Sequence, residues 1–264
     1  MASIAKIMKE PFVIAGPCSV ENESQTIETG IALAGIPQVK IYRGGVWKPR
    51  TRPSDFEGVG EIGLKWLQEV KKRTGLMLAT EVATPEHVRM ALKYDIDVLW
   101  IGARSTTNPF TVQSIADSVR KTGVTVMVKN PINADINLWI GAIERIRDAG
   151  IENIIAVHRG FYVYPKSKYR NSPEWNLLIE FKRQMYDIPV ISDPSHIGGK
   201  SDYIEELSQL AIDFDCEGLM IEVHIEPEKA LSDKQQQITP ERLKEILKNI
   251  KFRSSQFINS DVND

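Results

Sequence analysis

The chain has 264 residues, of which 42% are hydrophobic and 26% are charged, values typical of a globular protein with a full core. The formal net charge of −2 gives no sign of a nucleic-acid-binding surface, and no apolar run reaches the roughly 18 residues that a membrane span needs. Residues 1–10 lack the apolar region of a signal peptide, and two isolated cysteines, Cys18 and Cys216, do not make a disulfide framework. We therefore expect a cytoplasmic protein that binds neither nucleic acid nor membrane.

Apolar, strand-like runs alternate with amphipathic helical segments along the chain. The pattern predicts eight strands, at residues 12–16, 39–42, 76–80, 98–101, 124–128, 153–157, 188–191 and 218–223. It predicts helices at 21–34, 61–74, 110–122, 136–149, 175–185 and 203–212. Two more helices begin at Thr84 and Thr239, where threonine, proline and glutamate supply an N-cap, a first-turn proline and an acid. Residues 161–173 are the least periodic and predict a long polar loop.

Eight strand–helix units with near-continuous apolar strands predict an α/β fold with a parallel sheet covered by helices. A single (β/α)₈ TIM barrel over residues 1–250 fits both the number of units and the length. The alternative is an open doubly wound sheet. Against it, no G-x-G-x-x-G follows the first strand, and polar residues follow nearly every strand. Residues 251–264 predict a polar C-terminal tail outside the barrel.

The segment at residues 43–51 reads Arg-Gly-Gly-Val-Trp-Lys-Pro-Arg-Thr and directly follows the second predicted strand. It supplies three cations, Arg43, Lys48 and Arg50, and the hydroxyl of Thr51. Arginine matches phosphate or carboxylate oxygens with a planar fork, and the two glycines let the backbone approach a ligand closely. The segment is therefore either a phosphate clamp or a solvated basic turn.

In a parallel barrel the residues that follow each strand meet at one mouth. Six cations stand at these positions: Arg43, Lys48, Arg50, Arg104, Lys129 and Arg159. Any one of them alone is equally consistent with a surface salt bridge. Together, in a chain of net charge −2, they require an anionic ligand, and because one phosphate carries about −1.5 to −2 they indicate two anionic groups or more.

Four residues of metal-ligand type also follow predicted strands: Cys18, His196, Glu222 and Asp233. A thiolate, an imidazole and two carboxylates suit a divalent ion such as Zn²⁺, Fe²⁺ or Mn²⁺. The alternatives are a buried hydrophobe for Cys18, a turn residue for His196 and a cap for Asp233. His224 is a candidate for contact with the ligands, and Cys216 is expected in the core.

Five motifs resemble one family: residues 15–21 (Ala-Gly-Pro-Cys-Ser-Val-Glu), 43–51, 101–104 (Ile-Gly-Ala-Arg), 193–199 (Asp-Pro-Ser-His-Ile-Gly-Gly) and 222–233 (Glu-Val-His-Ile-Glu-Pro-Glu-Lys-Ala-Leu-Ser-Asp). The chain, over residues 12 to about 250, resembles the compact type I beta class of 3-deoxy-D-arabino-heptulosonate 7-phosphate (DAHP) synthase. The resemblance implies the first step of the shikimate pathway to aromatic amino acids. In that step phosphoenolpyruvate condenses with erythrose 4-phosphate and phosphate leaves.

The resemblance also implies roles for the residues at the mouth. Phosphoenolpyruvate would lie on Lys48, Arg104, Lys129 and Arg159, with Arg43 and the backbone of Ala103, and the phosphate of erythrose 4-phosphate on Arg50 and Thr51. One divalent ion, Mn²⁺, Fe²⁺ or Zn²⁺, would be held by Cys18, His196, Glu222 and Asp233 and would polarise the aldehyde. Lys129 is the candidate for proton delivery or charge stabilisation, and Glu81 for handling water.

Two positions depart from the commonest family pattern. Asn130-Pro131 follows Lys129 where many members continue Arg-Gly, and His158 precedes Arg159 where many have Glu. Both occur in the branch that is fused at its C-terminus to a chorismate mutase. We therefore expect the polar tail to be a linker stub, with a mutase as a fused or associated partner. Members of the family usually associate, which implies a homo-oligomer, a dimer or a tetramer.

Two alternative functions remain open. The sister enzyme, 3-deoxy-D-manno-octulosonate 8-phosphate synthase, uses arabinose 5-phosphate and has Lys-Ala-Asn-Arg where this chain has Lys48-Pro-Arg-Thr. An arginine one residue nearer the lysine suits a sugar phosphate of different reach, which favours the four-carbon sugar. The second alternative is a non-catalytic barrel that serves a chorismate mutase. The presence of all the expected metal-binding and anion-binding residues argues against it.

Overall fold

In the computed structural model, which describes residues 11–165 and 167–252, eight parallel strands close into a barrel in the order of the sequence. The strands are β1 (Phe12–Gly16), β2 (Val39–Arg43), β3 (Met77–Val82), β4 (Val98–Ile101), β5 (Thr125–Lys129), β6 (Ile154–His158), β7 (Val190–Ser192) and β8 (Gly218–Glu222). Strand β8 closes the barrel on β1, in a register that runs from Phe12 opposite Gly218 to Gly16 opposite Glu222. The predicted (β/α)₈ barrel is confirmed, and the open sheet is excluded.

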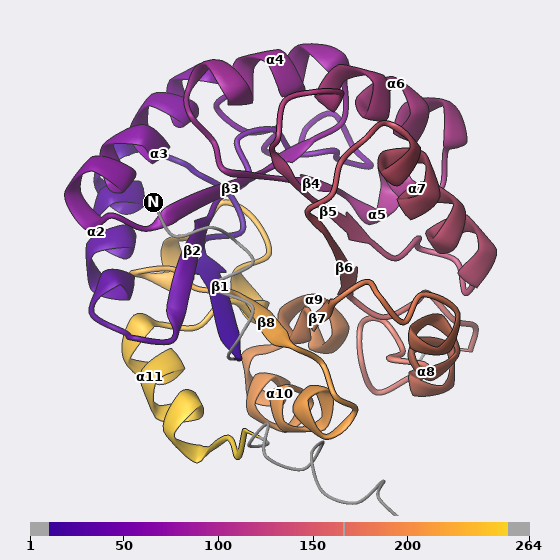
Figure 1. Cartoon of the computed structure of the whole chain (residues 1–264). Coiled ribbons are helices and arrows are strands. Elements are labelled where there is room, and N and C mark those ends of the chain that lie inside the picture. Colours follow the sequence, from indigo (N-terminus) through magenta and orange to yellow (C-terminus); the bar gives the residue numbers. More distant parts are fainter. Residues whose placement is uncertain (1–10, 166, 253–264) are drawn as a thin grey trace, which may run out of the picture.

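A ring of helices surrounds the barrel (Figure 1). The long ones are α2 (Glu23–Ala34), α3 (Glu61–Thr74), α4 (Pro85–Lys93), α6 (Pro109–Val119), α7 (Ile136–Asp148), α8 (Trp175–Gln184), α10 (Ile204–Asp213) and α11 (Pro240–Asn249). The hydroxyls of Thr84 and Thr239 accept hydrogen bonds from His87 N and Arg242 N, as the sequence predicts for N-caps.

Short helical segments that the sequence pattern did not predict follow several strands. Helices α5 (Ala103–Thr106) and α9 (Pro194–Gly198) begin directly after β4 and β7. Three 3₁₀ turns, η1 (Ser201–Tyr203), η2 (Pro227–Lys229) and η3 (Lys234–Gln236), lie in later connections. Segments of three to five residues are too short to show helical periodicity in a sequence.

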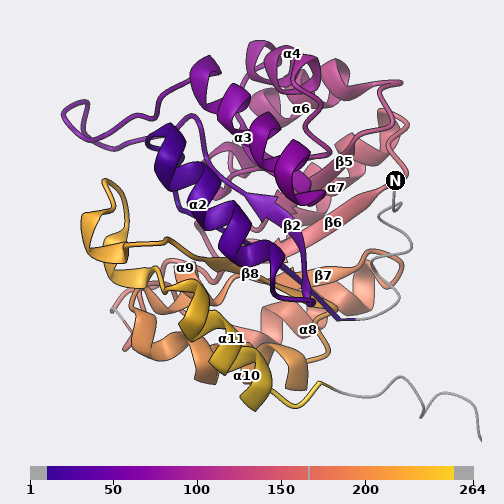
Figure 2. The same cartoon turned by 90° about the vertical axis from the view of Figure 1, so that its left-hand side faces the viewer.

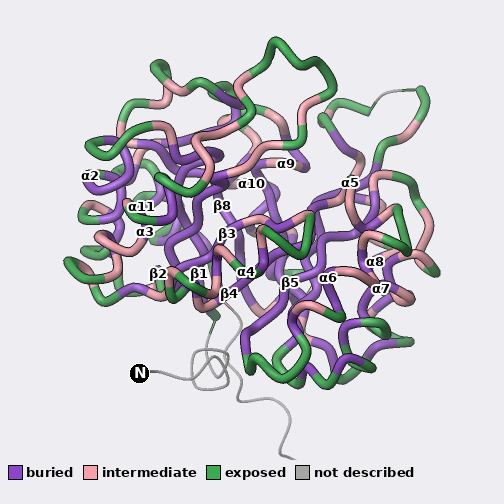
Figure 3. The backbone as a smooth tube through the Cα atoms, turned by 90° about the horizontal axis from the view of Figure 1, so that it is seen from above, coloured by how far each residue is buried: buried purple, intermediate pink, exposed green. Residues whose placement is uncertain are grey.

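The apolar core has two parts, which together bury both faces of the sheet. One lies between the strands and the helices, and the other fills the inside of the barrel with Phe12, Ile14, Ile41, Ala79, Val98, Trp100, Met127, Ile155, Val157, Ile191 and Met220. Side chains alternate between these two faces along each strand, so the strands read as continuous apolar runs. Most strand residues are accordingly buried, with Lys40 of β2 an exposed exception, as the largely purple strands of Figure 3 show.

The polar residues predicted at the strand ends point to one end of the barrel. The predicted ends of the third, fifth and sixth strands fell one or two residues short, because Glu81 lies within β3 and Lys129 and His158 are the last residues of β5 and β6. The connections after β2 (purple) and after β8 (yellow) project from this same end (Figure 2). The carboxyl ends of the strands therefore form the mouth.

Two further expectations concern the loops and the tail. Residues 161–165 and 167–173 lie outside helices and strands, as predicted for this loop, and a bridge joins Phe161 to Ser172. Of the predicted tail at 251–264, only Lys251 and Phe252 belong to the described residues, so the tail and its linker role lie outside them. Over residues 11–165 and 167–252, no helix is long and apolar enough to cross a membrane.

Gly16, at the end of β1, gives the first testable prediction. Its φ is +150°, and a side chain there would collide with the carbonyl oxygen of Arg43. We expect Gly16→Ala to lower the free energy of unfolding by about 2 kcal/mol or more, measured by urea denaturation. Gly141→Ala is the matched control, because Gly141 faces open space within α7 and alanine favours a helix by about 0.5–1 kcal/mol. Equal effects of the two substitutions would contradict this account of Gly16.

Candidate active site

A cavity of about 540 Å³ opens at the mouth of the barrel. Its lining comes from the ends of β2 to β8: Lys48, Pro49, Arg50, Thr51, Asp55, Glu81, Gly102, Ala103, Arg104, Lys129, Ile132, Arg159, Tyr162, Arg170, Asn171, His196 and Asp233. Six of these side chains are arginine or lysine and three are carboxylates. The cavity is therefore suited to an anionic ligand.

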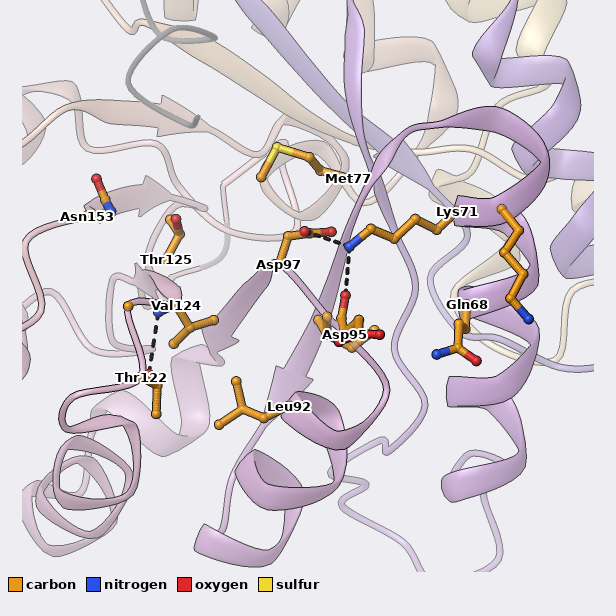
Figure 4. A pocket seen from close by; sticks show the side chains of 13 residues that line it. Gln68, Lys71, Met77, Leu92, Asp95, Asp97, Thr122, Val124, Thr125 and Asn153 are labelled. Carbon is orange, nitrogen blue, oxygen red and sulfur yellow. Dashed lines mark hydrogen bonds and ion pairs between the residues drawn. The ribbon is translucent and has the colours of Figure 1, made fainter. Parts of the chain in front are cut away.

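A larger cavity, of about 640 Å³, lies at the opposite end of the barrel, near the first residues of β3 and β5 (Figure 4). Two of its charged side chains, Lys71 and Asp97, are engaged with each other and with nearby backbone. Lys71 Nζ donates to Asp97 Oδ1 at 2.7 Å and to the Asp95 carbonyl at 2.9 Å, and Asp97 Oδ2 accepts from Leu78 N at 2.8 Å. These contacts hold the loops that precede the strands, so we assign the functional site to the mouth.

The segment at residues 43–51 forms one wall of the mouth and is not a solvated turn. Arg104, from the end of β4, donates to the Pro49 carbonyl at 2.9 Å and to Thr51 Oγ1 at 3.3 Å. Arg50 Nε donates to the Phe56 carbonyl at 2.8 Å. Lys48, Arg50 and Thr51 all line the cavity, and phosphate binding by this segment stays a prediction.

Arg43 lies beneath the cavity and is only 1% exposed. Its Nη1 is 3.2 Å from Glu222 Oε1, and its Nη2 donates to the Cys18 carbonyl at 3.0 Å. The guanidinium carbon lies 4.7 Å from the centre of the Trp100 ring, above the inner core. In this structure Arg43 joins Glu222 to the turn that carries Cys18 and is not among the residues that line the cavity, so its contact with a substrate stays a prediction.

Three of the four predicted metal ligands, Cys18, Glu222 and Asp233, come together at the edge of the cavity, and His196 lies beside one of them. Donor atoms of Cys18, Glu222 and Asp233 lie within 4.8 Å of one another, with Cys18 Sγ 3.3 Å from Asp233 Oδ2. His196 Nε2 lies 3.7 Å from Glu222 Oε1. That oxygen is buried and makes no hydrogen bond of good geometry with any described residue. A thiol, an imidazole and two carboxylates around such an oxygen fit a divalent ion.

Asp193 orients His196 and also binds Lys129. The carboxylate is fully buried, with Oδ2 2.8 Å from His196 Nδ1 and 2.7 Å from Lys129 Nζ. Burial alone would raise the pKa of Asp193, but His196 and Lys129 outweigh it and hold the pKa well below its usual range. The contact at Nδ1 turns Nε2 of His196 towards Glu222, which is the arrangement a metal-binding histidine needs.

Cys18 is fully buried beside a lysine. Lys48 Nζ lies 3.1 Å from Sγ and 3.2 Å from the Cys18 carbonyl. Burial, with Glu222 nearby, raises the pKa of the Cys18 thiol to about 12. The thiol is thus protonated at neutral pH in the absence of a metal, and a divalent ion would take the place of that proton.

Arg159 and its neighbours shape the far side of the cavity. Arg159 N donates to Asn130 Oδ1 at 2.7 Å, and Asn130 Nδ2 donates to the Gly160 carbonyl at 2.8 Å, which fixes the chain after β6. Burial lowers the pKa of Arg159 to about 10, so it remains cationic at neutral pH. Burial also lowers the pKa of His158 to about 4, and this neutral ring contacts the Pro173 carbonyl outside the cavity.

Some residues of the site were not predicted from the sequence. Asp193 follows the seventh predicted strand and opens one of the motifs, but no role was assigned to it, and Tyr162, Arg170 and Asn171 come from the aperiodic loop after β6. The only feature of the sequence that could have indicated these loop residues was a run of polar and basic residues after the sixth predicted strand. Cys216 is buried in the core, as expected. His224 Nε2 lies 3.8 Å from Glu21 Oε2, and its contact with the metal ligands stays a prediction.

Comparison with known proteins identifies the family. The model of the DAHP synthetase I family matches residues 6–256. The chain belongs to this family. It is 36% identical over 239 residues to phospho-2-dehydro-3-deoxyheptonate aldolase of Thermotoga maritima, covering 90% of this chain and 68% of that protein. It is 28% identical over 263 residues to 2-dehydro-3-deoxyphosphooctonate aldolase of Desulfatibacillum aliphaticivorans, covering 89% of each chain.

Solved structures of DAHP synthase from Thermotoga maritima agree with the barrel of this family member. One superposes with a TM-score of 0.82 at 32% identity, covering 91% of this chain and 68% of that chain. A truncated form of the same enzyme superposes with a TM-score of 0.79 at 31% identity, covering 91% of this chain and 85% of that chain. The similarity therefore extends over the whole barrel.

The Lys129–Asp193 pair gives the second prediction, since breaking a buried ion pair leaves a charge without its partner. We expect Asp193→Asn to lower the free energy of unfolding of the metal-free protein by about 3 kcal/mol. The double variant with Lys129→Met is expected to recover part of this loss. Denaturant unfolding of both single variants and the double variant measures the coupling, and strictly additive losses would show that the pair does not act as a unit.

Proposed function

We propose that the chain is a DAHP synthase that condenses phosphoenolpyruvate with erythrose 4-phosphate and releases phosphate. The observation that carries this proposal is a strongly cationic cavity directly beside a thiol, an imidazole and two carboxylates. The cations suit two phosphates and a carboxylate, and the four donors suit a divalent ion. Membership of the DAHP synthetase I family supports the same activity.

Each substrate would have its own part of the cavity. Phosphoenolpyruvate would lie on Lys48, Arg104, Lys129 and Arg159 with the backbone of Ala103, while Arg50 and Thr51 would hold the phosphate of the sugar. Arg104 contacts the Pro49 carbonyl and Thr51 Oγ1, so it would join the two parts and fix their spacing. A fixed spacing lets the reacting carbons meet in a defined orientation.

Lys129 and Glu81 are the groups placed to act on the reacting atoms. When bound by Cys18, His196, Glu222 and Asp233, a divalent ion supplies Lewis-acid polarisation of the aldehyde. Lys129, held by Asp193 at 2.7 Å, would stabilise charge or deliver a proton near C2 of phosphoenolpyruvate. Glu81 lies against Gly102, where any side chain would collide with its carboxylate, and would orient the water that completes the reaction.

The four-carbon sugar is favoured over arabinose 5-phosphate by two observations. The stretch Lys48-Pro49-Arg50-Thr51 departs from the Lys-Ala-Asn-Arg of the octulosonate enzymes, and its Arg50 and Thr51 both face the cavity. The chain is also more similar to the heptonate aldolase, at 36% identity, than to the octonate aldolase, at 28%.

We also propose three finer features. Lys129-Asn130-Pro131 and His158 favour the branch that carries a chorismate mutase, as a fused or associated partner. Association into a homo-oligomer rests on the resemblance to the family alone. A cytoplasmic location is supported by the composition of the chain and its two free cysteines.

The third prediction tests the activity. After removal of metals with EDTA and addition of Mn²⁺, the protein should release phosphate from phosphoenolpyruvate in the presence of erythrose 4-phosphate. Arabinose 5-phosphate should give little phosphate, and EDTA should abolish the reaction. A preference for arabinose 5-phosphate would favour the octulosonate enzyme. No turnover with Mn²⁺, Fe²⁺ or Zn²⁺ would favour the non-catalytic barrel.

The fourth prediction separates the binding and catalytic residues. We expect Arg50→Ala to raise the KM for erythrose 4-phosphate at least about tenfold with little change for phosphoenolpyruvate, because one charge-assisted contact to phosphate is lost. Lys129→Met should lower kcat about 100-fold or more, once folding has been verified by circular dichroism. Near-normal turnover of Lys129→Met would rule out its proposed role.

A further inference from the structure

Arg170 comes from the aperiodic loop after β6 and reaches two of the predicted metal ligands. Its Nη1 lies 2.9 Å from Asp233 Oδ1 and donates to Gln236 Oε1 at 2.7 Å. Gln236 is 1% exposed, and its Nε2 donates to Glu222 Oε2 at 2.7 Å. One guanidinium therefore contacts Asp233 directly and Glu222 through a buried amide.

The loop is anchored on the helix that carries a third predicted ligand. Arg170 N donates to the Gly198 carbonyl, and Asn171 Nδ2 donates to the His196 carbonyl at 2.6 Å. Gly199 has φ +70°, and a side chain on it would collide with Cβ of Arg170. Helix α9 and this loop thus fix both the position of Arg170 and that of His196.

The charge of Arg170 makes its position informative. A cation that contacts a metal ligand repels a divalent ion and reduces the charge of the carboxylate, so electrostatics alone would make Arg170 unfavourable for metal binding. Asp233 moreover has a left-handed backbone conformation, with φ +46°, which is uncommon for any residue except glycine. The contact from Arg170 would hold the side chain of Asp233 in place despite this uncommon backbone conformation.

We propose that Arg170 is a positioning residue that, together with Gln236, holds Asp233 and Glu222 in the arrangement that binds the divalent ion. The inference rests on the metal site of the proposed function. Gln236 lies only three residues after Asp233, so Arg170 contacts the loop that bears this ligand at two points. Without Arg170, the carboxylate of Asp233 would have more freedom to turn away from Cys18 and Glu222.

The test is the affinity for Mn²⁺ of the full chain after EDTA treatment, measured from the electron paramagnetic resonance signal of free Mn²⁺. We expect Arg170→Gln to raise the Kd about 10- to 100-fold, the usual effect of losing a residue that orients metal ligands. Arg170→Lys should recover part of the affinity. Arg183→Gln is the control, because exposed Arg183 on α8 pairs with Glu180 at 2.7 Å, and its loss should leave the Kd unchanged.

The sign of the change decides between two roles. If Arg170 were only a nearby charge, Arg170→Gln would leave the Kd unchanged or lower it, and either result would overturn the inference. If Arg170 and Gln236 act together, Gln236→Leu should also raise the Kd for Mn²⁺. The double variant Arg170→Gln/Gln236→Leu should then have a Kd about equal to that of whichever single variant binds Mn²⁺ more weakly. Fully additive losses would overturn the relay through Gln236. Thermal unfolding in EDTA checks that each variant is folded. If Arg170→Gln is not folded, the Kd of Arg170→Lys is compared with that of the unsubstituted protein instead.

The same experiment separates this inference from the proposed function. If the unsubstituted protein binds no Mn²⁺, the proposed metal site is wrong and the inference falls with it. If it binds Mn²⁺ but shows no turnover with either aldose phosphate, the proposed activity is wrong while the role of Arg170 is still decided by its Kd. If it binds Mn²⁺ and Arg170→Gln binds equally well, only the inference is wrong.

Discussion

Two buried ion pairs form the floor of the mouth, and the rest of the site depends on them. Arg43 pairs with Glu222 and Lys129 pairs with Asp193, and all four side chains are at most 6% exposed. A buried charge is tolerated only when a partner and hydrogen bonds compensate it. Because the partners come from the ends of β2, β8, β5 and β7, the pairs join different sides of the barrel above its apolar core. The two ion pairs thus fix the relative positions of the strand ends that carry the cations and the predicted metal ligands.

The floor also divides the charges of the mouth between two tasks. Glu222, itself a predicted metal ligand, pairs with Arg43 below the cavity. Asp193 pairs with Lys129 beside the cavity and contacts the predicted ligand His196. Lys48, Arg50, Arg104 and Arg159 remain directed towards the cavity, where an anion can meet them. The carboxylates and the cations therefore stabilise one another in the folded protein, and substrates and a metal would complete a site that is already largely formed.

The sequence predicts this site well where the fold itself brings residues together. A parallel barrel sends the end of every strand to one mouth, so Cys18, Arg104, Lys129 and Glu222 could be grouped without knowledge of the structure. It predicts poorly where long-range contacts decide the position. Arg170 meets Asp233 across 63 residues and Gln236 across 66, through a loop without periodicity. Whether Arg43 lies under the cavity or lines it likewise depends on the barrel register, which hydrophobic pattern alone does not specify.

In the proposed function, one mouth holds the divalent ion and the phosphoenolpyruvate side by side. A crystal of the Mn²⁺-loaded protein soaked with phosphoenolpyruvate, with diffraction data collected at the manganese edge, tests it most directly. The account predicts one anomalous peak among Cys18, His196, Glu222 and Asp233, with the phosphate of the ligand on Arg104 and Arg159. Mn²⁺ bound elsewhere, or phosphoenolpyruvate bound outside this cavity, would contradict it.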